Sequence, residues 1–189
     1  MKHTLIALTL TAIMSSSAFA AMDSYTIDPY HAFPVFSVNH LGFSTQRGRF
    51  DETSGTVQLD RTAKLGSVDL TIKTKSLDMG FPMWNADLAE EGFFNTAKFP
   101  TMTYKSSHLI FNGDKVVGAD GDFTLLGVTR PLHVIVANFH CGVNPMNKKQ
   151  LCSGDISATI KRSDYGMTKY LPAVGDEINI HVPIEAYKN

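Results

Sequence analysis

The side chains that could carry out chemistry are scattered along this chain and match none of the local patterns used by enzymes. There is no Gly-x-Ser-x-Gly turn, no His-Glu-x-x-His helix and no glycine-rich phosphate loop. The sequence therefore lacks the nucleophile turn of a serine hydrolase, the closely spaced ligands of a zinc enzyme and a nucleotide cradle. Beyond residue 20, the histidines fall on separate predicted strands, with no local metal spacing: His31, His40, His108, His133, His140 and His181. We expect no catalytic residue, no metal and no cofactor.

One histidine differs from the others in its position within a strand. His40 continues the face formed by Phe36 and Val38, so it should point inward near a strand end, whereas His133 and His181 fall on the outward phase. A buried imidazole needs a hydrogen-bond partner. His40 is therefore either a satisfied core histidine or a polar anchor for the head group of a ligand.

Arg162 is the other candidate polar residue, because it directly follows the predicted strand that ends at Ile160-Lys161. A guanidinium at the end of a sheet could meet a phosphate or a polarised carbonyl. It could equally pair with Asp164 or Asp28 and brace a turn. Both interpretations stay open at this point.

The two cysteines, Cys141 and Cys152, flank a segment rich in Gly, Pro and Asn that predicts a loop between two strands. They lack the Cys-x-x-Cys spacing of a redox motif, and no third sulfur is near. In an exported protein a pair of this kind forms a disulfide. We predict a structural disulfide between them.

Export is indicated by the first twenty residues. Lys2 precedes a short apolar stretch that ends in Ala18-Phe19-Ala20, which is typical of a secretory signal with a small-x-small cleavage site and is too short for a membrane span. We therefore expect a signal peptide over residues 1–20, one domain over residues 21–189 and a periplasmic location. The net charge of −1, which becomes −2 without Lys2, argues against nucleic acid as a partner.

The elements that must position these residues are strands. From residue 24 onward apolar and polar residues alternate, as expected for strands with one buried face, and about eight such strands occur without parallel crossovers. Asn112-Gly113 predicts a hairpin with a primed turn. A meander of this kind protects its edges by closing into a barrel or by stacking as a sandwich. The inward strand residues that we expect to contact a ligand are Phe36, Val38, Leu70, Ile72, Met102, Tyr104, Phe123, Leu125, Leu132, Val134, Val136, Ile156, Ala158 and Ile160.

One segment breaks the alternation. Between Phe81 and Phe94 the residues favour helix, with Pro82 suited to its first turn. We predict a short amphipathic helix that presents an apolar surface made of Trp84, Leu88, Phe93 and Phe94. It either plugs one end of the barrel or covers a ligand as a lid.

Several segments taken together resemble the YceI-like polyisoprenoid-binding family, and the resemblance covers the whole chain after the leader, in order. The segments are Ile27-Asp28-Pro29-Tyr30-His31, Phe36 to Gly42, Arg47-Gly48-Arg49-Phe50, Phe93-Phe94-Asn95, Phe99 to Ser106, Leu126 to Pro131, Ile160 to Met167 and Val174 to Glu177. The resemblance implies an eight-stranded antiparallel lipocalin-like barrel. Its interior would hold a polyprenyl phosphate-type lipid or an isoprenoid quinone.

The chain departs from the family pattern in the inserted helix. The usual Asp-x-His-Leu is replaced by Asn85-Ala86-Asp87-Leu88, which removes a histidine from the region where a head group could be recognised. The leading hypothesis is a non-catalytic carrier or reservoir of such a lipid, with transient membrane contact possible. The alternatives are an enzyme or redox accessory that acts on the bound isoprenoid through His40 or Arg162, and a structural barrel without ligand. The oligomeric state is unknown at this stage.

Overall fold

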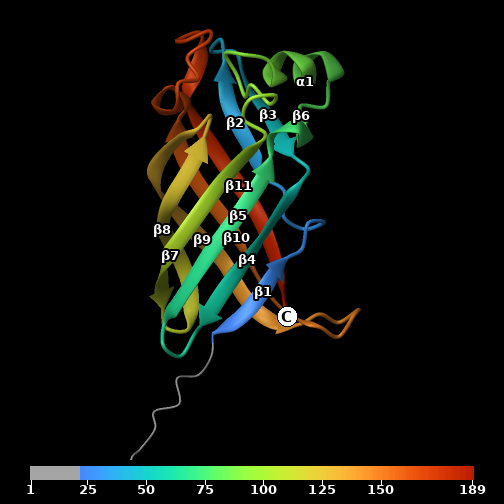
Figure 1. Cartoon of the computed structure of the whole chain (residues 1–189), viewed down its shortest axis with the longest axis vertical. Coiled ribbons are helices and arrows are strands. Elements are labelled where there is room, and N and C mark those ends of the chain that lie inside the picture. Colours follow the sequence, from blue (N-terminus) through green and yellow to red (C-terminus); the bar gives the residue numbers. More distant parts are fainter. Residues whose placement is uncertain (1–21) are drawn as a thin grey trace, which may run out of the picture.

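The computed structural model describes residues 22–189, so the expected signal peptide lies outside the described residues. This part of the chain forms a tall antiparallel barrel with one short helix at its upper end (Figure 1). Its strands are β1 (Asp23–Ile27), β2 (Val35–His40), β3 (Ser44–Phe50), β4 (Thr53–Asp60), β5 (Leu65–Lys73), β6 (Leu77–Asp78), β7 (Thr101–Asn112), β8 (Lys115–Leu125), β9 (Val128–Val143), β10 (Gln150–Lys161) and β11 (Val174–Lys188).

The barrel is closed by pairing the first and last strands. The hydrogen-bonded order is β1-β4-β5-β7-β8-β9-β10-β11, and β11 returns to β1 through the pairs Tyr25↔Lys188, Thr26↔Tyr187 and Ile27↔Ala186. Closure removes the exposed sheet edges on which other chains could pair. The structure confirms the predicted eight-stranded antiparallel barrel and decides against a sandwich.

Two positions of the barrel are occupied by two successive segments each. β1 and β2 both run antiparallel to β11, β1 beside its lower part and β2 beside its upper part, where Ile180 pairs with Phe36. β3 pairs with β2, and β4 then continues downward beside β1. The break between β1 and β2 falls at Pro29, which has no N–H to donate to a sheet.

A bulge in β9 shifts which residues face inward. Asn138 adopts a left-handed conformation (φ 54°), and β9 has one more residue than β10 between the pairs Asp155↔Ala137 and Ser153↔His140. An extra residue of this kind reverses the alternation of a strand. Val136 therefore faces inward before the bulge, and Phe139 and Cys141 face inward after it.

The predicted hairpin between β7 and β8 is confirmed. Asn112 pairs with Lys115, so the loop is Gly113-Asp114, and Gly113 has a φ of 64°. Positive φ at the first loop residue is a feature of a primed turn, which glycine adopts at little cost. The loop lies one residue further along the chain than the Asn112-Gly113 pair suggested.

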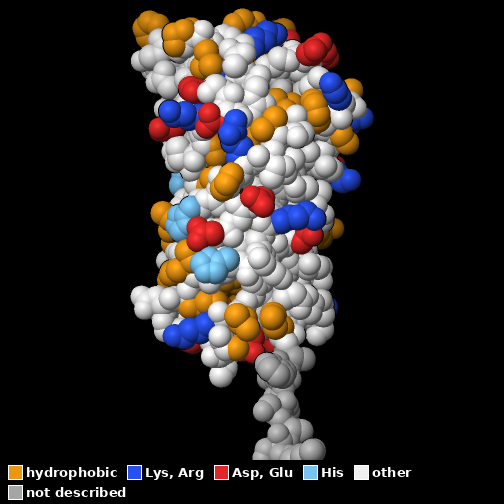
Figure 2. Space-filling view, turned by 60° about the vertical axis from the view of Figure 1, so that its left-hand side comes forward, with side chains coloured by type: hydrophobic (Ala, Val, Ile, Leu, Met, Phe, Trp, Pro, Cys, Tyr) orange, Lys and Arg blue, Asp and Glu red, His pale blue; other side chains and the backbone are white. Residues whose placement is uncertain are grey.

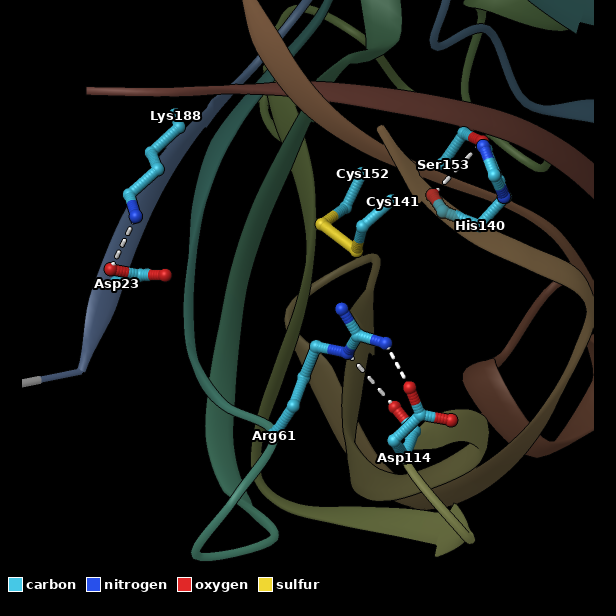
Figure 3. The surroundings of a disulfide bond; sticks show 8 residues. All are labelled: Asp23, Arg61, Asp114, His140, Cys141, Cys152, Ser153 and Lys188. Atoms are coloured by element: carbon cyan, nitrogen blue, oxygen red, sulfur yellow. Dashed lines mark hydrogen bonds and ion pairs between the residues drawn. A yellow bond between two sulfur atoms is a disulfide. The ribbon is translucent and has the colours of Figure 1, made fainter. Parts of the chain in front are cut away.

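The lower end of the barrel is braced by contacts between neighbouring turns and strands (Figure 3). Arg61 in the β4–β5 turn pairs with the carboxylate of Asp114 in the β7–β8 turn, and its Nε donates to the Asp114 carbonyl at 3.0 Å. Lys188 Nζ lies 2.7 Å from Asp23 Oδ1 and so ties β11 to β1. These contacts join neighbouring turns and the first and last strands at the lower end.

The helix α1 (Pro82–Ala89) lies beside the rim of the upper end, with Pro82 in its first turn as predicted. The prediction of an amphipathic helix is wrong, because none of its residues is buried. Met83 is 61% exposed, and Trp84 and Leu88 make only partial contact with the barrel. The helix spans little more than two turns at the edge of the barrel, so no side of it is fully buried, although Leu88 packs against the core. Among the described helices none is long and apolar enough to cross a membrane.

Candidate functional site

The interior of the barrel contains a cavity of about 510 Å³, within the range of roughly 300–1,000 Å³ typical of small-molecule sites. It extends from His40, Trp84 and Tyr170 at the upper end to Tyr25, Leu109 and Cys152 near the lower end. The structure brings all of the sequence-predicted site residues to its wall. These are Phe36, Val38, His40, Leu70, Ile72, Trp84, Leu88, Phe93, Phe94, Met102, Tyr104, Phe123, Leu125, Leu132, Val134, Val136, Ile156, Ala158, Ile160 and Arg162.

Most of the wall is aliphatic or aromatic. In its upper half Phe94, which follows α1, packs its ring edge-on against Phe50 with 5.2 Å between ring centroids and lies 6.0 Å from Phe36. Phe50 was missed from the sequence because the strand containing it, β3, is rich in polar residues. β11 adds a further row that alternation could have placed in the site: Ile178, Ile180, Val182 and Ile184.

Polar side chains gather at the upper mouth of the cavity. His40, Gln46, Asp87, Glu90 and Lys169 line this end, and the last three are exposed. The ring of His40 lies 6.3 Å from that of Trp84. No hydrogen bond joins its ring nitrogens to another residue of the described chain. The imidazole of His40 is therefore half-buried at the mouth and free to meet a polar group of a ligand.

Arg162 has a structural role at the same end. Its side chain is 3% exposed and donates four hydrogen bonds to backbone carbonyls, of Gly175, Met167, Lys169 and Val174, at 2.8 to 3.0 Å. Burial lowers the pKa of this guanidinium, while nearby Asp176 acts in the opposite direction.

Arg162 therefore braces the connection between β10 and β11. The predicted pairing with Asp164 or Asp28 is wrong. The guanidinium of Arg162 donates instead to backbone carbonyls, and the carboxylate of Asp28 is hydrogen-bonded to His31.

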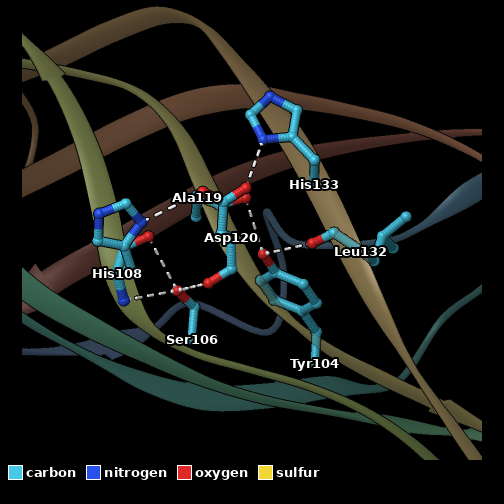
Figure 4. Close-up of polar contacts among 7 residues, drawn as sticks. All are labelled: Tyr104, Ser106, His108, Ala119, Asp120, Leu132 and His133. Atoms are coloured by element: carbon cyan, nitrogen blue, oxygen red, sulfur yellow. Dashed lines mark hydrogen bonds and ion pairs between the residues drawn. The ribbon is translucent and has the colours of Figure 1, made fainter.

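Tyr104 is a wall residue whose hydroxyl is already engaged (Figure 4). Its OH lies 3.2 Å from the Ala119 carbonyl and 3.3 Å from that of Leu132, on the two strands that follow β7. Burial raises the pKa of this phenol to about 12, helped by the nearby charges of Asp120 and Asp122. The phenol therefore stays protonated and serves the packing of the wall.

On the outside of the same strands, two histidines share one carboxylate (Figure 4). His133 Nδ1 lies 2.7 Å from Asp120 Oδ1, and His108 Nδ1 lies 3.2 Å from Asp120 Oδ2. The bond to His133 is the main cause that lowers the pKa of Asp120. All three side chains face solvent, which confirms the exposed position predicted for His133.

A second cluster of polar side chains was not predicted from the sequence. His31 Nδ1 lies 2.8 Å from Asp28 Oδ2 and 4.0 Å from Glu185 Oε2, and within residues 22–189 this is the one trio spaced closely enough to hold a metal ion. The backbone N–H of Asp28 also donates to the Glu185 carbonyl at 2.9 Å. These bonds fasten the turn after β1 onto β11. Only the closed barrel brings Glu185 to this turn, so local spacing gave no signal.

Cys141 and Cys152 form the predicted disulfide, and the described residues include no free cysteine. The two residues face each other on β9 and β10, and Cys152 lines the lower part of the cavity (Figure 3). The disulfide therefore contributes to the inner wall of the barrel.

A closed eight-stranded barrel around an elongated apolar cavity defines a lipocalin-like class of binding protein. Residues 25–186 match the YceI-like domain. Protein YceI of Escherichia coli O157:H7 is 31% identical over 188 residues, which cover 98% of this chain and 97% of that protein. A UPF0312 protein of Pseudomonas aeruginosa is 30% identical and covers 100% of this chain and 99% of its own length. The chain belongs to the YceI-like family.

Solved structures share the fold. BcnA of Burkholderia cenocepacia superposes with a TM-score of 0.68 at 24% identity, covering 84% of this chain and 98% of that one. A polyisoprenoid binding domain from Saccharophagus degradans superposes with a TM-score of 0.61 at 16% identity, covering 87% of this chain and 98% of that domain. Family and fold together identify a barrel binding protein.

Proposed function

We propose that this protein is a periplasmic carrier or reservoir for a long-chain isoprenoid lipid, either a polyprenyl phosphate-type lipid or an isoprenoid quinone. The observation that carries the proposal is the cavity, which is elongated, is almost wholly apolar along its walls and has its charged side chains at the upper end. The tail would lie between the strands and the head group at the mouth. The name of the structurally similar polyisoprenoid binding domain supports the choice of ligand.

The walls could supply the binding energy without a charged partner. Burying a methylene group is worth roughly 0.8 kcal/mol, so each five-carbon isoprene unit contributes on the order of 3 to 4 kcal/mol before costs. Ordering a flexible chain and immobilising the ligand consume much of that sum. A few enclosed units would still leave a useful affinity.

The mouth favours a head group of low net charge. Asp87 and Glu90 border it together with Lys169, so negative and positive side chains are mixed there. Arg162 already uses four of its N–H groups on backbone carbonyls. The half-buried imidazole of His40 remains to donate to a quinone carbonyl or a similar acceptor. We propose that a quinone ring suits this mouth better than a phosphate.

The proposed role is binding without catalysis. The Tyr104 hydroxyl and the Arg162 guanidinium are both bonded to the backbone, and His40 stands at the mouth without a carboxylate to orient it. The signal-like leader and the disulfide support a periplasmic location. Uptake of the lipid would need transient contact with a membrane.

The deciding experiment extracts the purified protein with organic solvent and identifies its lipid by mass spectrometry. Ala158 lines the cavity and Ala137 on β9 faces outward, so Ala158→Phe and Ala137→Phe place the same new ring inside and outside the barrel. We expect stoichiometric isoprenoid in the wild type and in Ala137→Phe, and a strong loss in a folded Ala158→Phe. Only adventitious phospholipid, or chemically altered isoprenoid as a product, would contradict the carrier role.

A further inference from the structure

Large apolar side chains are exposed at the upper end, around the mouth of the cavity. Phe43 is 92% exposed and Leu41 51% exposed in the turn between β2 and β3. Phe81, Met83 and Trp84 of the α1 region and Tyr170 of the β10–β11 connection complete the set, which we name the rim patch: Leu41, Phe43, Phe81, Met83, Trp84 and Tyr170. Figure 2 shows hydrophobic side chains at this end of the molecule.

The backbone holds the β2–β3 turn in a defined shape. Asn39 Oδ1 accepts the N–H of Gly42 at 2.9 Å, and the N–H of Leu41 donates to the Ala173 carbonyl at 2.9 Å. Leu41 has a φ of 58°, a left-handed conformation that bulky residues rarely adopt. Tyr170, in the neighbouring β10–β11 connection, has a φ of 64°. Leu41 and Tyr170 therefore combine a left-handed backbone conformation with an exposed apolar side chain at the rim.

We propose that the rim patch inserts into the interfacial layer of a lipid bilayer, so that the mouth of the cavity opens directly onto the membrane. This inference rests on the proposed function, because a lipid with an insoluble tail must pass between the bilayer and the mouth. Trp84 and Tyr170 belong to both the rim patch and the cavity wall, so the two surfaces are continuous.

The composition of the rim patch suits a bilayer. Aromatic side chains with a polar tip are enriched at the membrane interface. Lys169 Nζ lies 4.9 Å from the ring centroid of Phe93 and 5.3 Å from that of Tyr170, so its ammonium group makes cation–π contacts with two aromatic rings beside the mouth.

Charge is not the driving force for this docking. Asp87 and Glu90 lie at the same mouth as Lys169, so the charged side chains that line it are of both signs. Docking should therefore depend on apolar insertion and persist at high salt. It should also need no anionic lipid.

The test is flotation of the purified protein with phosphatidylcholine vesicles that contain no isoprenoid. The test variant is Leu41→Ser combined with Phe43→Ser, since neither residue lines the cavity. The control is Leu65→Ser combined with Met146→Ser at the lower end, where the exposures of 55% and 91% match those of the test pair. We expect the test variant to bind vesicles about tenfold more weakly or worse, and the control to match the wild type.

Equal flotation of the test and control variants, or no flotation of the wild type, would overturn the docking inference. Uptake of a long-chain ubiquinone and of a polyprenyl phosphate from detergent micelles, each measured on the same variants, separates the docking inference from the proposed function. Ligand uptake without flotation would contradict the docking inference and leave the carrier function standing. Flotation without ligand uptake would contradict the carrier function. The last measurement is sedimentation of the wild type and the test variant. A concentration-dependent dimer that the test variant abolishes would assign the rim patch to a second copy of the chain.

Discussion

At the scale of single residues, the side of a strand on which a residue lies decides its role. Val134 is 6% exposed and lines the cavity, whereas its neighbour Ile135 is 55% exposed on the outer surface. Alternation along the sequence predicted this phase correctly, because period two is a property of any extended strand. It could not predict the partners of Arg162, since backbone carbonyls carry no signature in the sequence.

The first prediction uses this pair of neighbours. Val134→Glu places a carboxylate in a dry interior, so it should lower the free energy of unfolding by about 3 kcal/mol or more and abolish ligand binding. Ile135→Glu should change that free energy by less than about 0.5 kcal/mol. Urea unfolding followed by circular dichroism measures both. Similar losses in the two variants would mean that the inner and outer faces are assigned wrongly.

The second prediction concerns His31. The hydrogen bond to Asp28, with help from the charge of Glu185, raises the pKa of His31 above its ordinary value of 6.5. The folded protein therefore holds this proton more tightly than the unfolded chain does. The resulting stability is complete below the ordinary pKa and is lost as the pH rises through the raised pKa.

Unfolding of the wild type and of His31→Gln should be compared from about pH 5.5 to about pH 8.5. The advantage of the wild type should be largest at the acid end of this range and shrink toward the alkaline end. The His108–Asp120–His133 cluster is present in both proteins, so it cancels in the comparison. A difference that does not vary with pH would exclude this role for His31.

At the scale of elements, the strands were predicted better than the features that interrupt them. The sequence predicted about eight strands and the hairpin before Lys115, but not the bulge at Asn138 or the division of one barrel position into β1 and β2. Local alternation decides a strand, whereas a bulge depends on the register with the neighbouring strand. The position of the helix along the chain was predicted correctly. Its exposure was not, because that depends on where the helix lies against the closed barrel.

The third prediction concerns the disulfide between β9 and β10. Thiol titration of the native, unreduced protein should detect no free thiol, and reduction in denaturant should release two. Cys141→Ser combined with Cys152→Ser should lower the free energy of unfolding by roughly 2 to 4 kcal/mol, because the unfolded chain loses a constraint. Reactive thiols in the native protein would point instead to a redox role.

The fourth prediction uses Trp84 in α1 as a reporter. Trp84 is 36% exposed and lines the mouth, so a quinone ring bound there should quench its emission saturably. A polyprenyl phosphate should shift the emission without strong quenching. Trp84→Phe keeps most of the apolar area and should bind while losing the signal. An unchanged emission during binding confirmed by extraction would show that α1 is a plug remote from the ligand.

At the scale of the whole molecule, the barrel has two unlike ends. The lower end is held by the Arg61–Asp114 and Asp23–Lys188 pairs and by the disulfide, whereas the upper end carries α1, the rim patch and the cavity mouth (Figure 1). The sequence predicted the barrel and a helical insertion at one end of it, but not the contacts at the opposite end. The difference between the two ends depends on which connections between strands are short and which are long.

The fifth prediction follows from filling the cavity. A ligand that binds only the folded barrel stabilises it by about 2.7 kcal/mol at a free concentration of 100 times its Kd, so Tm should rise steadily with long-chain ubiquinone. Calorimetry of delipidated protein measures this rise, and a quinone lacking the isoprenoid tail serves as the control. Equal rises with both compounds would place the binding energy in the ring and not in the tail.

The closing pairs between β1 and β11 also limit the order in which the chain can fold. The pair Tyr25↔Lys188 joins positions near the two ends of the domain, so the barrel cannot close until almost all of the domain is available for pairing. Folds dominated by such distant pairings form slowly and leave unpaired strands exposed meanwhile. We therefore expect the exported chain to stay open until its last strand is available, and to depend on chaperones during that interval.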